Sequence, residues 1–171
     1  TGEFYAHDMG FYREVLAVTK DAVRGRMDIY AGANNITTRG AVEIAKAVEQ
    51  VGGIDALSVL TPMFVSQTQY EVSEYYREIA SETNLPIIIY NNRPKTNVTV
   101  EPATVAKLAE IDNVIGVKDS TGDMTNTEEY LRLTRGMDNF HVMMGRDTLI
   151  YAALCYGCLL YTSDAADEAR S

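Results

Sequence analysis

The chain has 171 residues, with 15 Lys and Arg against 24 Asp and Glu, so its formal net charge is −9. This acidic balance argues against a nucleic-acid partner, because phosphate backbones are bound mainly by Lys and Arg. Apolar runs stay below the roughly 18 residues of a membrane span, and no signal-peptide pattern opens the chain. Its two Cys do not make a disulfide framework. These features predict a cytoplasmic globular protein without a membrane partner.

Short apolar runs alternate with longer amphipathic stretches along the chain. Their Val, Ile and Leu content predicts strands at 27–32, 56–61, 86–90, 114–118 and 141–145. Amphipathic patterns between and after them predict helices at 38–51, 68–82, 102–110, 128–135 and 148–156. His7-Asp8 indicates the start of another helix, and Thr37 or Thr38 is expected to cap the helix at 38–51.

The strand ends recur at a nearly constant interval of about 28 residues. The last residues of the predicted strands are Gly32, Thr61, Tyr90, Lys118 and Gly145. A strand, a crossover helix and two short loops need about this length, so the sequence predicts parallel βα units. Both a closed (β/α)8 TIM barrel and an open doubly wound sheet fit this α/β pattern. Polar residues at successive strand ends, and the lack of a GxGxxG loop, favour the barrel.

Lys118 and Tyr90 are the candidate reactive residues. Lys118 ends an apolar strand, and a buried neutral amine in a barrel mouth can attack a carbonyl to form a Schiff base. The alternative is a strand-end Lys held in a salt bridge. Tyr90 ends the preceding strand, where a phenol can pass protons to and from a substrate. The alternative for Tyr90 is a core Tyr with a satisfied hydroxyl.

Four motifs together are more specific than any one of them. They are Thr-Gly-Glu-Phe at 1–4, Leu-Thr-Pro at 60–62, Tyr-Asn-Asn at 90–92 and Gly-Val-Lys-Asp-Ser-Thr-Gly-Asp at 116–123. In their order and spacing the chain resembles the dihydrodipicolinate synthase and N-acetylneuraminate lyase family, from Thr1 to about Gly157. The resemblance implies a class I lyase in which Lys118 forms a covalent imine with pyruvate or another 2-oxo acid. Tyr90 would transfer protons, with no metal or organic cofactor.

The resemblance also implies roles for three further residues. Thr1 matches the second Thr of a Thr-Thr-Gly-Glu loop that holds the pyruvate carboxylate, and Gly145 matches a strand-end Gly near the site. Lys95 falls where many members have an Arg that binds a substrate carboxylate. The TIM barrel would then be truncated, without its first strand, most of its second and its eighth. The implied partners are an aldehyde substrate and copies of the chain in a homotetramer.

Two departures from the family pattern bear on the second substrate. Phe64 stands where synthases usually have a Tyr that completes a proton relay across a subunit contact. Lys95 lacks the bidentate fork of Arg, for which Arg93 is a candidate substitute. We expect first a synthase that condenses pyruvate with aspartate semialdehyde. The alternatives are a 2-keto-3-deoxy sugar acid or N-acetylneuraminate aldolase, a barrel that only binds a small acid, and an open-sheet binding module.

The end of the chain differs in character from the rest. Residues 158–171 resemble the translated adapter of a sequencing library, so we expect a partial barrel at 1–157 and a non-native tail, with a natural acidic tail as the alternative. The helix at 148–156 should lead into one more strand. Cys155 and Cys158 form a Cys-x-x-Cys pair, but a zinc site needs two more ligands. We therefore predict no metal site.

Overall fold

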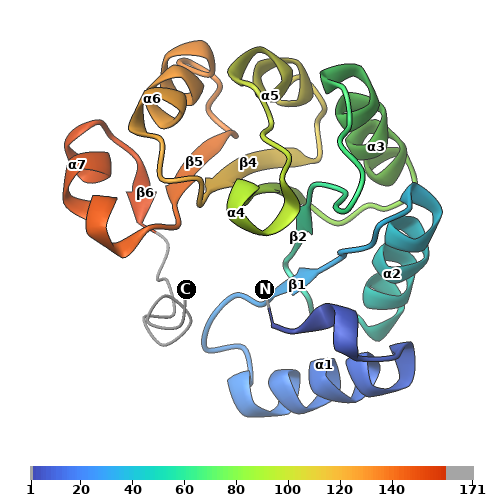
Figure 1. Ribbon diagram of the computed structural model, residues 1–171. Helices are drawn as coiled ribbons and strands as arrows, with labels where there is room; N and C mark the ends of the chain where they lie inside the picture. Colours follow the sequence, from blue (N-terminus) through green and yellow to red (C-terminus); the bar gives the residue numbers. More distant parts are fainter. Residues whose placement is uncertain (1, 161–171) are drawn as a thin grey trace.

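The computed structural model describes residues 2–160, which form one parallel sheet with helices along one of its faces (Figure 1). The strands of this part of the chain are β1 (Tyr30–Gly32), β2 (Ala56–Leu60), β3 (Ile87–Asn91), β4 (Val114–Asp119), β5 (His141–Met144) and β6 (Leu159–Leu160). The α-helices are α1 (Met9–Val23), α2 (Thr38–Val51), α3 (Gln69–Ser81), α4 (Arg93–Thr96), α5 (Pro102–Leu108), α6 (Met124–Leu133) and α7 (Ile150–Cys155). Two 3₁₀ turns, η1 (Phe4–Ala6) and η2 (Asp147–Leu149), precede α1 and α7. None of the described helices is long and apolar enough to cross a membrane.

The strands follow one another across the sheet in chain order, and every neighbouring pair is parallel. Helices form the crossovers that parallel strands require, so the predicted βα units are confirmed. The strand predicted at 27–32 begins only at Tyr30; just before it, the Ile29 N–H donates to the Asp55 carboxylate and the Ile29 carbonyl accepts from Asp55 N. β6 forms where the helix at 148–156 was expected to lead into another strand. The rest of the predicted tail, 161–171, lies outside the described residues.

The strand order contains no topological switch point among the described strands. A doubly wound sheet reverses its strand order part-way, and this sheet does not. Figure 1 shows the strands following an arc, with the longer helices around its outside and α4 inside the ring. This is the arrangement of consecutive βα units in a barrel and argues against the open-sheet alternative. Within residues 2–160 the arc is not closed, since β1 pairs only with β2 and β6 only with β5.

Local capping explains where two predicted helices begin. The Thr37 hydroxyl accepts a hydrogen bond from Gly40 N at 3.1 Å, so α2 starts as predicted at Thr38. α3 begins directly after Thr68, which is its N-cap and forms a reciprocal capping box with Glu71. Those hydrogen bonds hold the pKa of the Glu71 carboxyl below its ordinary value. Both starts could be predicted because each cap involves residues three apart in sequence.

Of the other helices, α1 begins where the sequence indicated, whereas α6 and α4 differ from the prediction. α1 begins after Asp8, as His7-Asp8 indicated, and the Asp8 carboxylate accepts from Phe11 N at 2.8 Å. α6 begins earlier than predicted because the Asp123 carboxylate caps its first turn, in a stretch of low helix propensity. α4 is a single turn that was not predicted and that contains Pro94, which fits a first helical turn.

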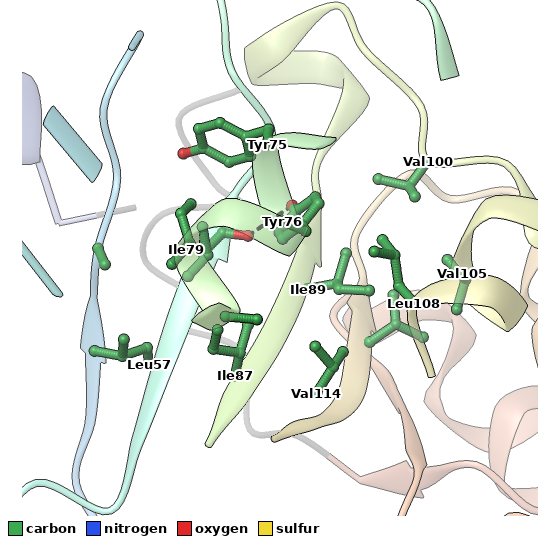
Figure 2. Packing of buried hydrophobic residues seen from close by; sticks show 14 of the residues in the cluster. Leu57, Tyr75, Tyr76, Ile79, Ile87, Ile89, Val100, Val105, Leu108 and Val114 are labelled. Atoms are coloured by element: carbon green, nitrogen blue, oxygen red, sulfur yellow. Dashed lines mark hydrogen bonds between the residues drawn. The ribbon is translucent and has the colours of Figure 1, made fainter. Parts of the chain in front are cut away.

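The main core fills the space between the sheet and the helices. Figure 2 shows Leu57, Ile87 and Ile89 of the strands facing Tyr76 and Ile79 of α3. Tyr76 is fully buried, and its hydroxyl donates to a backbone carbonyl of β2 at 2.9 Å. Burial of these side chains fixes which face of each strand turns toward the helices, because side chains alternate along a strand.

The opposite face of the sheet carries a much smaller apolar cluster, made of Ala56, Ile88 and Met143 with Ile115 beside them. These residues sit between the helix-facing ones in sequence, as alternation requires. The longer helices pack on the other face (Figure 1), so this is the face on which strand-end side chains can form a site.

Candidate active site

An extra residue in β4 decides which way Lys118 faces. The pairing of β3 with β4 shifts between Ile87 and Ile88, which inserts a bulge into β4. As a result Val114 and Val117, three residues apart, both lie in the helix-side core. Lys118 therefore leaves the strand on the opposite face, away from the helices.

Lys118 and Tyr90 lie side by side on that face. They are paired in the ladder between β3 and β4, and the Lys118 Nζ lies 4.5 Å from the centroid of the Tyr90 ring. Both side chains are half-buried. An ammonium over the face of an aromatic ring is electrostatically favourable. The structure thus places the predicted amine and the predicted phenol together at the carboxyl ends of adjacent strands.

Gly145 leaves room for the Lys118 side chain. A β-carbon at this position would lie 2.9 Å from Lys118 Cε, closer than real β-carbons approach other atoms, and would also meet Ser120 Oγ. Gly145 is buried, and its N–H donates to the Asp119 carbonyl at 2.8 Å. A larger residue at position 145 would therefore displace the side chain that carries the amine.

Asp119 ties the end of β4 to α6 on the helix side of the sheet. It is buried, and its carboxylate accepts from Thr127 Oγ1 at 2.7 Å and from Thr121 N at 3.0 Å. Burial raises the pKa of Asp119 above its ordinary value; the hydrogen bonds from Thr127 and Thr121 oppose this, and the charge of Asp123 adds to it. The tie holds the strand end next to Lys118.

Tyr130 of α6 holds the end of β3 in a second buried network. Its hydroxyl donates to the Val100 carbonyl and accepts from Asn91 Nδ2 at 2.8 Å and from Asn126 Nδ2 at 3.1 Å. Asn91 Oδ1 in turn accepts from Val100 N at 3.2 Å. Burial raises the pKa of Tyr130 well above its ordinary value, so the hydroxyl stays neutral. The network fixes the backbone directly after Tyr90.

The predicted carboxylate-binding side chains of the described residues lie on α4, just beyond the end of β3. Thr1 lies outside the described residues. Lys95 and Arg93 are exposed on α4, which directly follows β3 and so stands at the carboxyl ends of the strands. Within residues 2–160 neither side chain has an ion-pair partner. Phe64 is 93% exposed in the loop after β2, with a left-handed φ of 80°.

Sequence reasoning missed two polar residues beside the reactive pair. Asn92 is buried, and its Nδ2 donates to the Tyr90 hydroxyl at 3.0 Å. Ser120 is also buried, with its Oγ against Gly145 on the side where Lys118 Cε lies. Each stands two positions after a candidate residue, and side chains two apart in extended chain share a face. That spacing was the signal that could have identified them.

A cavity of about 360 Å³ lies near the other end of the sheet, against α1. Neither Lys118 nor Tyr90 lines it; the residues around it include Phe4, His7, Phe11, Tyr12 and Asn34. The Tyr12 hydroxyl donates to the Gly32 carbonyl at 2.7 Å, and burial raises the pKa of Tyr12 to about 12. The cavity is thus separate from the reactive pair.

The described residues offer no cluster for a metal ion. No group of three or more His, Cys, Asp or Glu side chains in residues 2–160 could hold one. Cys155 and Cys158 are free thiols, exposed and buried respectively, and burial raises the pKa of Cys158 to about 11.

Comparison with known proteins identifies one family, whose curated members are longer than this chain. The model of the dihydrodipicolinate synthetase family matches residues 1–167. The 4-hydroxy-tetrahydrodipicolinate synthase of Thermodesulfovibrio yellowstonii is 35% identical over 157 residues, which are 92% of this chain and 53% of that protein. The chain therefore spans about half the length of this curated relative.

Solved structures of similar proteins share the fold. A monomeric dihydrodipicolinate synthase variant matches with a TM-score of 0.92 and 27% identity, over 99% of this chain and 57% of that one. The chloride-inhibited dihydrodipicolinate synthase from Acinetobacter baumannii complexed with pyruvate matches with a TM-score of 0.91 and 30% identity, over 99% and 57%. The 2-keto 3-deoxygluconate aldolase from Picrophilus torridus matches with a TM-score of 0.83 and 29% identity, over 92% and 56%.

Proposed function

Because the chain belongs to the dihydrodipicolinate synthetase family, we propose that it is part of a Schiff-base lyase that condenses pyruvate with aspartate semialdehyde. The observation that carries the proposal is the position of the Lys118 Nζ, 4.5 Å from the centre of the Tyr90 ring on the face of the sheet away from the longer helices. An amine and a phenol at this separation can act on the same carbonyl group.

The proposed reaction begins with attack of the unprotonated Lys118 amine on the keto carbon of pyruvate. The carbinolamine that forms loses its hydroxyl as water, with the proton supplied by the Tyr90 phenol, and the C=N bond of the imine replaces the C–O bond. The Tyr90 phenolate then takes a proton from the methyl group to give an enamine, whose carbon attacks the aldehyde carbon of the second substrate while the aldehyde oxygen takes the proton back from Tyr90. Attack of the second substrate's amino group on the imine carbon breaks the bond to Lys118 and frees its amine. This chemistry needs no metal or organic cofactor.

Three other residues would bind the substrates. Thr1, by the family resemblance, would hold the pyruvate carboxylate, and Gly145 would keep space for the imine next to Lys118. Lys95 would attract the carboxylate of the second substrate as a point charge, since its side chain is exposed at the carboxyl ends of the strands.

A sugar-acid aldolase is the second candidate. Phe64 and Lys95 depart from the synthase pattern, and the similarity to the Picrophilus torridus aldolase supports this alternative. A barrel that binds a small acid without reacting is a third candidate, which would show pyruvate affinity but no imine.

We further propose that the sheet closes into a (β/α)8 barrel with segments that this chain does not contain. The chain spans 53% of its Thermodesulfovibrio yellowstonii relative, and the described arc is open between β1 and β6. Residues 2–160 would then supply six consecutive strands of the barrel. The 171-residue chain alone would be inactive, and the assembled protein would be a homo-oligomer, a tetramer by resemblance.

The experiment uses the full-length protein, meaning the whole product of the gene that encodes this chain. We expect it to consume pyruvate when aspartate semialdehyde is added, and the Lys118→Ala variant to lose this activity by about three orders of magnitude or more. Lys107→Ala is the matched control, because Lys107 is exposed on α5.

Two other outcomes would reject the synthase assignment, and a third would reject the role of Lys118. Release of pyruvate from 2-keto-3-deoxygluconate, without aldehyde-dependent consumption, would assign the aldolase. Pyruvate binding with neither reaction would assign the binding barrel. Full activity in Lys118→Ala would remove Lys118 from the reaction.

A further inference from the structure

We propose that Asn92 is a positioning residue that sets the direction of the Tyr90 hydroxyl proton; this inference rests on the proposed function. Tyr90 and Asn92 are two positions apart at the end of β3, so their side chains leave the backbone on the same face. Asn92 Nδ2 donates to the Tyr90 hydroxyl at 3.0 Å, and Asn92 is only 8% exposed.

The position of Asn92 in the fold does not by itself explain this hydrogen bond. Asn92 is the N-cap of α4, where an Asn side chain ordinarily accepts a hydrogen bond from the N–H of the helix's first turn. Here no such side-chain bond is formed. The backbone carbonyl of Asn92 instead accepts from Lys95 N at 3.0 Å and from Thr96 N at 3.1 Å. The amide is thereby left to bond the Tyr90 phenol.

The hydrogen bond determines where the phenol proton can go. An amide nitrogen only donates, so the Tyr90 oxygen accepts from Asn92 and its own O–H must point elsewhere. Lys118 Nζ lies over the same ring. The hydroxyl proton is therefore kept on the part of the phenol that a substrate joined to Lys118 can reach.

The same N–H would also stabilise the phenolate that forms when Tyr90 gives its proton to the departing hydroxyl. A donor aimed in advance at developing negative charge speeds the step in which that charge appears. Asn92 should consequently affect the rate of imine formation and turnover more than the affinity for pyruvate.

The test compares Asn92→Ala and Asn92→Asp in the full-length protein, with Asn139→Ala as the matched control at an exposed site before β5. We expect Asn92→Ala to lower kcat by about tenfold to a hundredfold and to leave KM for pyruvate within about twofold. Asn92→Asp should be slower still, because a carboxylate accepts the phenol proton instead of donating to the oxygen. A purely structural role predicts the reverse order, since Asp has the shape of Asn.

A double-mutant cycle adds a readout that does not depend on one variant folding well. In a Tyr90→Phe background, Asn92→Ala should have no further effect on the rate of borohydride trapping with pyruvate, because the hydroxyl it positions is absent. The inference would be overturned if the rate losses of Tyr90→Phe and Asn92→Ala multiplied in the double variant, or if Asn92→Asp were as fast as wild type. If the wild-type protein itself traps no pyruvate, the proposed function has failed; if it does and the Asn92 variants match it, only this inference has failed.

Discussion

Lys118 stands beside Tyr90 because three backbone features act on the same few atoms. The bulge in β4 turns Lys118 away from the helices, and the ladder pairs it with Tyr90. Gly145 provides no β-carbon where Lys118 Cε lies. Since each of these is a property of the folded chain alone, the pair is in place before a substrate arrives.

Gly145→Ala tests the importance of that space at the scale of one methyl group. The new β-carbon would meet Ser120 Oγ first and would also lie 2.9 Å from Lys118 Cε and 3.2 Å from the Asp119 carbonyl, so both the serine and the lysine side chains must move. We expect the full-length variant to fold but to react with pyruvate about tenfold to a hundredfold more slowly. A misplacement of a reacting group by about 1 Å lowers reaction rates by up to about this factor. Rates of borohydride trapping measure this, with Gly10→Ala, exposed on α1, as the control. Wild-type rates in Gly145→Ala would contradict the role of Gly145.

The reactive pair was predicted from sequence, whereas Asn92 was missed although its spacing from Tyr90 pointed to it. Lys118 and Tyr90 each end an apolar run, and strand ends meet at one edge of a parallel sheet. The Tyr-Asn-Asn motif does not say which hydrogen bonds the two amides form. Asn91 bonds Tyr130 on the helix side and Asn92 bonds Tyr90 on the other, which only the register of β3 decides.

At the scale of elements, buried side chains of α6 hold the ends of β3 and β4. Tyr130 bonds Asn91, and Thr127 bonds Asp119. The first bond joins residues 39 positions apart and the second spans the loop between β4 and α6, eight positions, so neither follows from a helix or strand pattern. The start of α6 was missed for a different reason: its Asp123 cap is local, but it lies in a run whose intrinsic helix propensity is low. The start of α2, fixed by a cap next to it in the chain, was predicted.

Asp119→Asn tests the tie between β4 and α6 through its pH dependence. Burial raises the pKa of Asp119 in the folded state, so the folded chain holds this proton more readily than the unfolded chain does. The contribution of Asp119 to the free energy of unfolding should therefore be lost as the pH rises through its pKa in the folded state. Asn does not titrate, so the variant should lack that loss and gain stability relative to wild type as the pH rises from about 4 to about 7.

Urea unfolding of the full-length protein at several pH values checks this. Asp138→Asn is the control, because Asp138 is exposed before β5. A wild-type protein that gains stability relative to Asp119→Asn over this range would show that the carboxylate is favoured in the folded state, contrary to the expected direction.

At the scale of the whole molecule, the two ends of the arc have uncovered surfaces. α1 exposes Phe11, Val15 and Val18, which lie on one helical face, and α7 exposes Tyr151 and Leu154. β1 and β6 each have one strand partner among the described residues. The regular strand spacing was enough to predict the βα units and their order. Whether the sheet closes depends on contacts between its two ends, which no local pattern reports.

These surfaces predict that the 171-residue chain is poorly stable by itself. Open strand edges and apolar helix faces favour aggregation and local opening. We expect rapid limited proteolysis and a broad or irreversible melting curve for this chain, and slow proteolysis with a cooperative transition for the full-length protein. A sharp, reversible transition of the 171-residue chain alone would contradict this prediction.

The most direct measurement of the central claim locates the covalent bond to pyruvate. The full-length protein is incubated with pyruvate and borohydride, digested, and its peptides are analysed by mass spectrometry. We predict one reduced pyruvyl group on the peptide that contains Lys118, and none on those that contain Lys20, Lys46, Lys95 or Lys107. The absence of any adduct, or an adduct that persists in Lys118→Ala, would contradict the account.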